Sequence, residues 1–174
     1  QGDRFSVVYE TLEADGETQA AITQARAKGA VVVVAAGNDG ADASRTTPAN
    51  CSGVVAVAAT NAAGGKASYS NTGANVTLAA PGGDAGSGIV STLNAGTSAP
   101  GADAYAAYAG TSMATPHVSA VAALMLSVNK SLTPDQVGTM LKASARSFPA
   151  ACSGCGSGIV DASAAVALAA AAAG

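Results

Sequence analysis

The sequence predicts an α/β fold in which a mostly parallel sheet is flanked by helices, and three observations support this. Residues 30–36 include four consecutive valines, a short β-branched run typical of a strand buried on both faces of a parallel sheet. A helical pattern over 16–28, closed by Gly29 as a C-cap, precedes it, so helix and strand form half of a β-α-β unit. Of all residues, 49% are hydrophobic but only 3% aromatic, so small side chains dominate and helices can pack closely on the sheet.

Further strands are expected in chain order. Residues 54–60 predict a second buried strand, 76–80 a short strand, and 89–93 an edge or hairpin strand. Residues 94–104, rich in Ala, Gly, Ser and Thr, read as a loop.

Three more helices are expected. Residues 113–128 are apolar or small at nearly every position, which predicts a helix buried in the middle of the domain. The sequence Thr133-Pro134-Asp135-Gln136 is a capping box with proline at the first helical position, and an amphipathic helix follows it. After Gly158-Ile159-Val160-Asp161 an alanine-rich helix begins.

Length and charge limit the function classes. The 174 residues suffice for one domain, and we divide them into an uncertain segment, 1–15, and a domain over 16–174. The net charge is −3 and no basic block is present, so we expect neither a nucleic-acid partner nor attachment to a membrane. No transmembrane helix and no signal-peptide pattern is expected; a signal would have been removed or never lay on this piece.

The three cysteines are Cys51, Cys152 and Cys155. A zinc site needs more ligands than one Cys-Ser-Gly-Cys pair and a single histidine provide. A redox-active pair would stand at a helix N-terminus rather than in a glycine-rich loop. We therefore expect a local structural disulfide between Cys152 and Cys155 in a secreted protein, with no metal. Cys51 is then either buried and unbridged or paired outside this sequence.

A polar turn runs into the apolar helix through the nine residues Gly110-Thr111-Ser112-Met113-Ala114-Thr115-Pro116-His117-Val118. It places Ser112 at a helix N-terminus, where the dipole and the unpaired N–H groups of the helix favour negative charge. An isolated serine there would be an N-cap or part of a packing turn. The full string is far more specific, and it resembles the signature around the nucleophile of subtilisin-like serine peptidases, the subtilase family.

The resemblance implies the C-terminal portion of a subtilisin-like fold and a serine endopeptidase that acts through an acyl-enzyme, with Ser112 as nucleophile. The segment Ala35-Ala36-Gly37-Asn38 resembles the family segment whose asparagine donates a hydrogen bond to the developing oxyanion. By this resemblance Asn38 and the Ser112 N–H are the oxyanion donors, and Ala35, Ala36 and Gly37 line the primary specificity pocket. It also implies a peptide or protein substrate and a secreted enzyme.

Neither the general base nor its acid partner is found in this sequence. His117 is the single histidine, and five residues along a helix from Ser112 it should point away from the serine. The family order is Asp, His, Ser, but no histidine and no Asp-Thr-Gly or Asp-Ser-Gly after a strand precedes Ser112. The resemblance thus covers only the C-terminal part of a catalytic domain, over about 16–168 of this chain.

Three hypotheses about function remain. The first is the serine-bearing part of a peptidase, inactive alone and completed by the missing upstream part of the catalytic domain as partner. The second is a non-catalytic pseudo-peptidase that binds peptides along an exposed sheet edge. The third, a Cys-x-x-Cys redox protein, ranks below both.

Other positions depart from the family pattern. The resemblance allows structural calcium, but Thr77 stands where many relatives have the aspartate that binds it, which weakens the expectation of calcium at that site. We therefore expect no cofactor. The family's substrate-binding Ser-Leu-Gly-Gly strand has no counterpart in 1–15. In secreted relatives a cysteine near that segment often pairs with the one at the position of Cys51.

Overall fold

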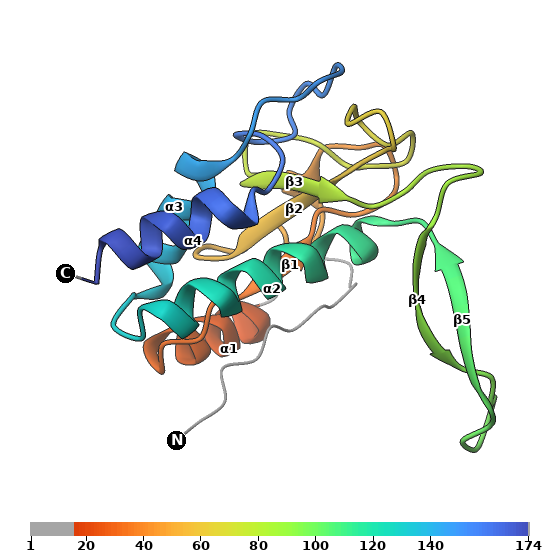
Figure 1. The fold of residues 1–174 in the computed structure, drawn as a ribbon, viewed down its shortest axis with the longest axis horizontal. Coiled ribbons are helices and arrows are strands. Elements are labelled where there is room, and N and C mark those ends of the chain that lie inside the picture. Colours follow the sequence, from red (N-terminus) through yellow and green to blue (C-terminus); the bar gives the residue numbers. More distant parts are fainter. Residues whose placement is uncertain (1–15, 174) are drawn as a thin grey trace.

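The computed structural model describes residues 16–173, so the uncertain segment 1–15 and Gly174 lie outside the described residues. A small parallel sheet forms the middle of three layers (Figure 1). The strands are β1 (Val33–Ala35), β2 (Val55–Thr60), β3 (Leu78–Pro81), β4 (Ile89–Asn94) and β5 (Asp103–Tyr108). The helices are α1 (Gly16–Ala27), the short 3-10 helix η1 (Ala43–Arg45), α2 (Thr111–Val128), α3 (Pro134–Ser144) and α4 (Ala162–Ala171).

The three-stranded sheet has the order β1-β2-β3, with both pairs parallel, which confirms the predicted α/β class. Val33 pairs with Val55, and Val57 pairs with Leu78. Every residue of β1 and β2 is buried, as the unbroken apolar runs predict. The three strands run in one direction, so their carboxyl ends meet at one edge, and the loops there can share a site.

The two faces of the sheet have different partners because side chains alternate along a strand. Val55, Val57 and Ala59 of β2 face α2, α3 and α4, and together they form the largest hydrophobic cluster. Ala56 faces α1, and Ala58 faces the loops around Ala43 and Cys155. The sheet is therefore covered on both sides.

Strands β4 and β5 form an antiparallel hairpin that projects from the body of the molecule (Figure 1). The predicted hairpin strand is confirmed, but the expected loop over 94–104 was too long, and β5 was not foreseen. Alanine and aspartate, which are depleted in strands, make up four of the six residues of β5, and its pairing with β4 decides its conformation. The hairpin exposes large apolar side chains, among them Val90, Leu93, Tyr105 and Tyr108.

Helix α2 lies against the sheet and against α4. By length and composition alone it could cross a membrane. Here its buried residues, including Val118 and Met125, pack on the sheet. The expectation that it is buried all round was wrong, because Leu124 is 50% and Val128 is 44% exposed. Helix α2 is an outer layer of the described chain, so one of its sides remains uncovered.

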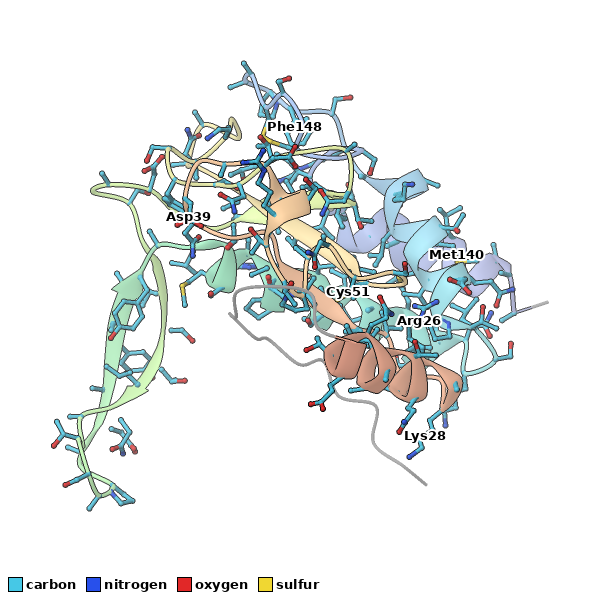
Figure 2. The ribbon with its side chains drawn as sticks, turned by 180° about the vertical axis from the view of Figure 1, so that it is seen from behind. Arg26, Lys28, Asp39, Cys51, Met140 and Phe148 are labelled. Atoms are coloured by element: carbon cyan, nitrogen blue, oxygen red, sulfur yellow. A yellow bond between two sulfur atoms is a disulfide. The ribbon has the colours of Figure 1, made fainter. Side chains whose placement is uncertain are left out.

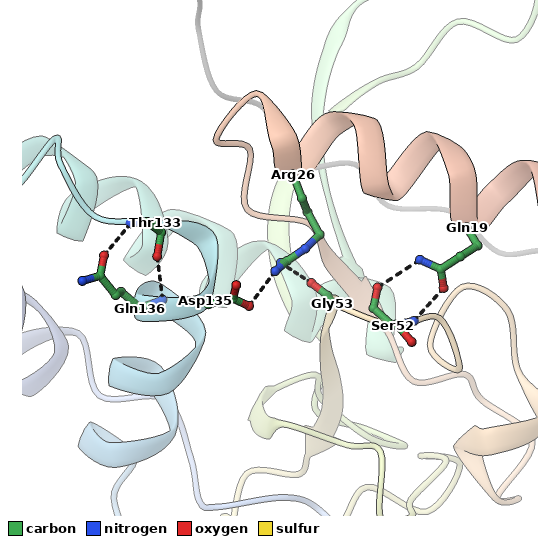
Figure 3. Close-up of polar contacts among 7 residues, drawn as sticks. All are labelled: Gln19, Arg26, Ser52, Gly53, Thr133, Asp135 and Gln136. Atoms are coloured by element: carbon green, nitrogen blue, oxygen red, sulfur yellow. Dashed lines mark hydrogen bonds and ion pairs between the residues drawn. The ribbon is translucent and has the colours of Figure 1, made fainter.

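Side chains of α1 tie the loop before β2 to the helices (Figure 3). Gln19 and Ser52 exchange two hydrogen bonds, in which Ser52 N donates to Oε1 (2.8 Å) and Nε2 donates to the Ser52 carbonyl (3.2 Å). The Arg26 guanidinium donates to the Gly53 carbonyl and forms an ion pair with Asp135 of α3 (2.6 Å).

The predicted capping box of α3 is present. Thr133 and Gln136 form the capping box of α3, with Thr133 Oγ1 accepting from Gln136 N and Gln136 Oε1 accepting from Thr133 N (Figure 3). Asp161 caps α4 by accepting from Ala164 N (2.9 Å). Both helices therefore begin where the sequence signals place them.

The Cys152–Cys155 disulfide is formed, as predicted from the spacing, and it lies beside Phe148 (Figure 2). Cys155 is fully buried. Cys51 is also buried, in the cluster between α1 and the sheet, and its Sγ lies 3.9 Å from Asn50 Oδ1.

Candidate active site

The carboxyl ends of β1 and β3 meet the N-terminus of α2. After β3 the Gly82 carbonyl accepts from the Gly110 N–H (3.0 Å), which docks the start of α2 at this edge. Gly82 has no room for a side chain, because an added Cβ would lie 2.5 Å from Ala59 Cβ and 2.8 Å from the Gly110 carbonyl oxygen. The close approach of β3 and α2 therefore needs glycine at this point.

Asn38, in the loop after β1, is held against this helix N-terminus. Its Oδ1 accepts two hydrogen bonds from Thr111, one from the backbone N–H (2.8 Å) and one from the hydroxyl (2.9 Å). The same hydroxyl accepts from the Gly37 N–H (3.3 Å). These bonds fix the orientation of the Asn38 amide, and its Nδ2 is the group that can donate to a substrate.

Ser112 directly follows Thr111 in the first turn of α2 and is half-buried. The structure thus brings together Ser112 and Asn38, two sequence-predicted site residues from segments 74 positions apart. A hydroxyl at a helix N-terminus beside an oriented amide donor suits chemistry in which negative charge develops on an oxygen.

His117 is bonded to its own helix, with Nδ1 2.9 Å from the Met113 carbonyl oxygen. A carbonyl only accepts, so Nδ1 carries the proton in this contact. The imidazole therefore has a local structural partner one turn back along α2.

The other site residues predicted from the family resemblance lie at the end of β1. Ala35 and Ala36 are buried, and Ala36 N donates to the Val57 carbonyl (3.0 Å). Gly37 has a φ of +104°, a left-handed conformation that favours glycine. Their assignment to a specificity pocket remains a prediction.

Two residues that sequence reasoning did not single out support the site. Asn71 is fully buried beneath the loop that carries Asn38, and its only sequence signal is a turn-like Asn-Thr-Gly. The Tyr69 hydroxyl lies within hydrogen-bonding distance of the Gly82 (2.9 Å) and Gly83 (2.8 Å) carbonyls. Burial raises the pKa of Tyr69 to about 12, and the nearby Asp84 carboxylate adds to this rise.

Thr77 lies far from these residues, in a cleft of about 220 Å³ between α1, the start of β2 and α3. Its Oγ1 accepts from the Ala56 N–H (3.1 Å), and its carbonyl accepts from the Ser157 N–H (3.1 Å). The charged residues that line this cleft are Arg26, Asp135 and Lys142. Calcium takes six to eight oxygen ligands, and two cationic side chains with one carboxylate do not fit it. Within 16–173, no three His, Cys, Asp or Glu side chains are grouped to hold a metal ion.

Comparison with protein families matches residues 8–173 to the subtilase family. An extracellular protease of Xanthomonas campestris is 56% identical over 150 residues, which cover 85% of this chain and 25% of the relative. An extracellular basic protease of Dichelobacter nodosus is 46% identical over 79% of this chain and 23% of that protein. A subtilisin of Bacillus pumilus is 39% identical over 71% of this chain and 42% of its own length.

Two solved protease structures are also similar to this chain. A protease of Pseudoalteromonas arctica superimposes with a TM-score of 0.91 at 46% identity, covering 94% of this chain and 51% of that one. A cold-adapted subtilisin-like serine proteinase superimposes with a TM-score of 0.71 at 33% identity, over 90% and 52% of the two chains. This chain thus spans about half of each solved structure and less than half of these three curated relatives.

Proposed function

The chain belongs to the subtilase family, and from this premise we propose that it is the nucleophile-bearing part of a serine endopeptidase. The observation that supports this most directly is the pair of bonds that hold Asn38 Oδ1 on Thr111, next to Ser112. In the proposed reaction the Ser112 hydroxyl attacks the carbonyl carbon of a peptide, and the carbonyl oxygen becomes an oxyanion. Asn38 Nδ2 and the Ser112 N–H would stabilise that oxyanion.

The attack needs a base, because a serine hydroxyl is a weak nucleophile until its proton is removed. His117 is the single histidine of the sequence, and its Nδ1 is engaged with Met113 of the same helix. We propose that the base and its carboxylate partner come from another segment of a longer protein, with which this chain forms one catalytic domain. The proton of Ser112 then passes to that base and later to the leaving amine, and water hydrolyses the acyl-enzyme.

The substrate and location follow from the same proposal. The substrates would be peptides or proteins, and the reaction would take place outside the cell. The names of the Xanthomonas and Dichelobacter relatives, both called extracellular, support this location. The Cys152–Cys155 disulfide also suits an oxidising compartment.

The test compares the 174-residue chain with a longer product that includes the sequence preceding Gln1 in its gene. We expect the longer product to hydrolyse a chromogenic peptide and Ser112→Ala to abolish this. The short chain should give only trace hydrolysis, about 10³–10⁴-fold above water, as remains in this peptidase class without a triad. Ser119→Ala is the matched control, because Ser119 lies on the same helix and, within residues 16–173, its hydroxyl bonds only to the Thr115 carbonyl (3.2 Å) of that helix.

Two outcomes would contradict the proposal. Peptidase-rate hydrolysis by the short chain, lost in Ser112→Ala, would show that the base lies within it. A folded longer product that binds peptides without cleaving them would favour the pseudo-peptidase reading.

A further inference from the structure

We propose that Asn71 is a positioning residue for the oxyanion hole, one that acts through Asn38 without touching the substrate. The proposal rests on the proposed function, because it concerns the donor that would stabilise the oxyanion. It adds a residue from a different loop, 33 positions further along the chain, to the machinery of that site.

Asn71 forms hydrogen bonds with the backbone on both sides of Asn38. Before Asn38, its Nδ2 donates to the Ala36 carbonyl (3.0 Å), and its backbone N–H donates to the Gly37 carbonyl (2.9 Å). After Asn38, its Oδ1 accepts from the N–H groups of Asp39 (2.9 Å) and Ala41 (2.9 Å). Four hydrogen bonds therefore set the path of the loop, with Asn38 at its centre.

The side chain of Asn71 also fills the space beside Gly37. A Cβ added to Gly37 would lie 2.3 Å from Asn71 Nδ2, and the φ of +104° at Gly37 disfavours any other residue. The absence of a side chain at Gly37 is thus what lets the amide reach the Ala36 carbonyl. The glycine before Asn38 and the buried asparagine form one unit.

The chemistry of this position calls for an amide. Asn71 is fully buried, and its Nδ2 also donates to Thr46 Oγ1 (3.0 Å), so both its donor and its acceptor capacities are used. A carboxylate could only accept, so two donor bonds would be lost beside a carbonyl oxygen. A serine would be too short to reach both sides of the loop.

The loop that carries Asn71 is itself anchored to the sheet. Ser70, which precedes Asn71, accepts from the Ala59 N–H of β2 (2.9 Å) and donates to the Asn71 carbonyl (3.0 Å). Asn71 thus links the end of β2 to the loop after β1, and Thr111 holds the Asn38 amide from the side of α2. The donor is fixed from two elements, as a preorganised oxyanion hole requires.

The first test measures hydrogen exchange in the 174-residue chain with Asn71→Ser. We expect the N–H groups of Asp39 and Ala41 to exchange about tenfold faster relative to those of β2, because their acceptor is gone. Asn129→Ser is the matched control. Asn129 is also buried and donates to the Ala169 carbonyl (3.1 Å), but it lies at the opposite end of α2. It should leave the exchange of Asp39 and Ala41, relative to β2, unchanged.

The second test measures kcat and KM in the longer, active product. Asn38→Ala should lower kcat by about 10²–10³-fold, a figure measured for the equivalent donor of subtilisin itself, a member of this family. Asn71→Ser should lower kcat by about 10–100-fold and change KM by less, because the main effect falls on the donor that stabilises the oxyanion. The double variant should lose no more kcat than Asn38→Ala alone.

The outcomes separate the two proposals. If no version shows hydrolysis that depends on Ser112, the proposed function fails, while the exchange test still reports on the loop. If Asn38→Ala lowers kcat but Asn71→Ser does not, or if Asp39 and Ala41 keep their protection, the positioning role is wrong. Should Asn71→Ser fail to fold, Asn71→Asp, which keeps the acceptor oxygens, takes its place in the kinetic test, with the same expected losses.

Discussion

The neighbouring residues Thr111 and Ser112 have different roles. The backbone N–H and hydroxyl of Thr111 hold the Asn38 amide, while Ser112 presents the hydroxyl that we propose as nucleophile. Thr111 is fully buried whereas Ser112 is half-buried, so the Ser112 hydroxyl is the more accessible of the two. An oxyanion donor fixed in this way needs no rearrangement during the reaction.

Also at the scale of a residue, Tyr69 predicts how stability responds to alkaline pH. Its pKa is raised to about 12, and that of an unfolded tyrosine is about 10. Between these values the folded chain keeps a proton that the unfolded chain has released, so stability should fall as the pH rises from about 10 to 12. Denaturant unfolding at a series of pH values checks this.

Tyr69→Phe is the variant for this measurement. It removes the ionising group together with the contacts to the Gly82 and Gly83 carbonyls, so it should be less stable at neutral pH. Its stability should nevertheless fall less steeply between pH 10 and 12. Equal slopes for the two proteins would show that Tyr69 does not cause the loss.

At the scale of an element, Arg26 connects α1 to the loop before β2 and to α3. The Arg26 side chain is 18% exposed, and its guanidinium contacts both the Gly53 carbonyl and Asp135 (Figure 3). Gly53 has a φ of +82°, and a Cβ there would lie 2.5 Å from Arg26 Nε, so the loop is shaped around this side chain. The positively charged side chain of Arg26 therefore links these three segments beside the cleft that contains Thr77.

We accordingly expect the melting temperature to be unchanged by EDTA or by added calcium and to fall in Arg26→Ala. Loss of a largely buried hydrogen-bonding side chain costs about 1–2 kcal/mol, or about 2–8 °C in Tm for a chain of this length. Arg45→Ala, at an exposed arginine, should leave Tm unchanged. A drop in Tm on chelation, with no effect of Arg26→Ala, would contradict this account.

At the scale of the whole molecule, β1 is an outer strand of the three-stranded sheet. Within residues 16–173, β1 pairs with β2 along one edge, and its residues are apolar and buried. Unpaired edges of apolar strands promote association. The described chain also spans about half of the solved relatives, in agreement with a catalytic domain completed by a further segment.

We therefore predict that the longer product has a higher Tm than the 174-residue chain and remains monomeric where the short chain self-associates. A segment that binds only the folded state stabilises it by mass action. Thermal unfolding and size-exclusion chromatography at several concentrations measure both effects. A short chain that is monomeric and melts as high as the longer product would show that the edge needs no partner.

The sequence alone determined the features that depend on residues close together in the chain. The valine run predicted β1, the capping box predicted the start of α3, and the spacing of Cys152 and Cys155 predicted their disulfide. The motif around Ser112 identified the family. Periodicity, capping and short disulfide loops act over a few residues, so their signals survive in a single sequence.

Only the tertiary structure decided how distant segments meet. It paired alanine-rich β5 with β4, left Leu124 of α2 exposed, and set Thr111 against Asn38 across 73 positions. It also placed Asn71 beneath the Asn38 loop. Such contacts have no local pattern, because a buried asparagine and a loop asparagine look alike in sequence. Their hydrogen bonds form only when packing of the sheet against α2 brings the loops together.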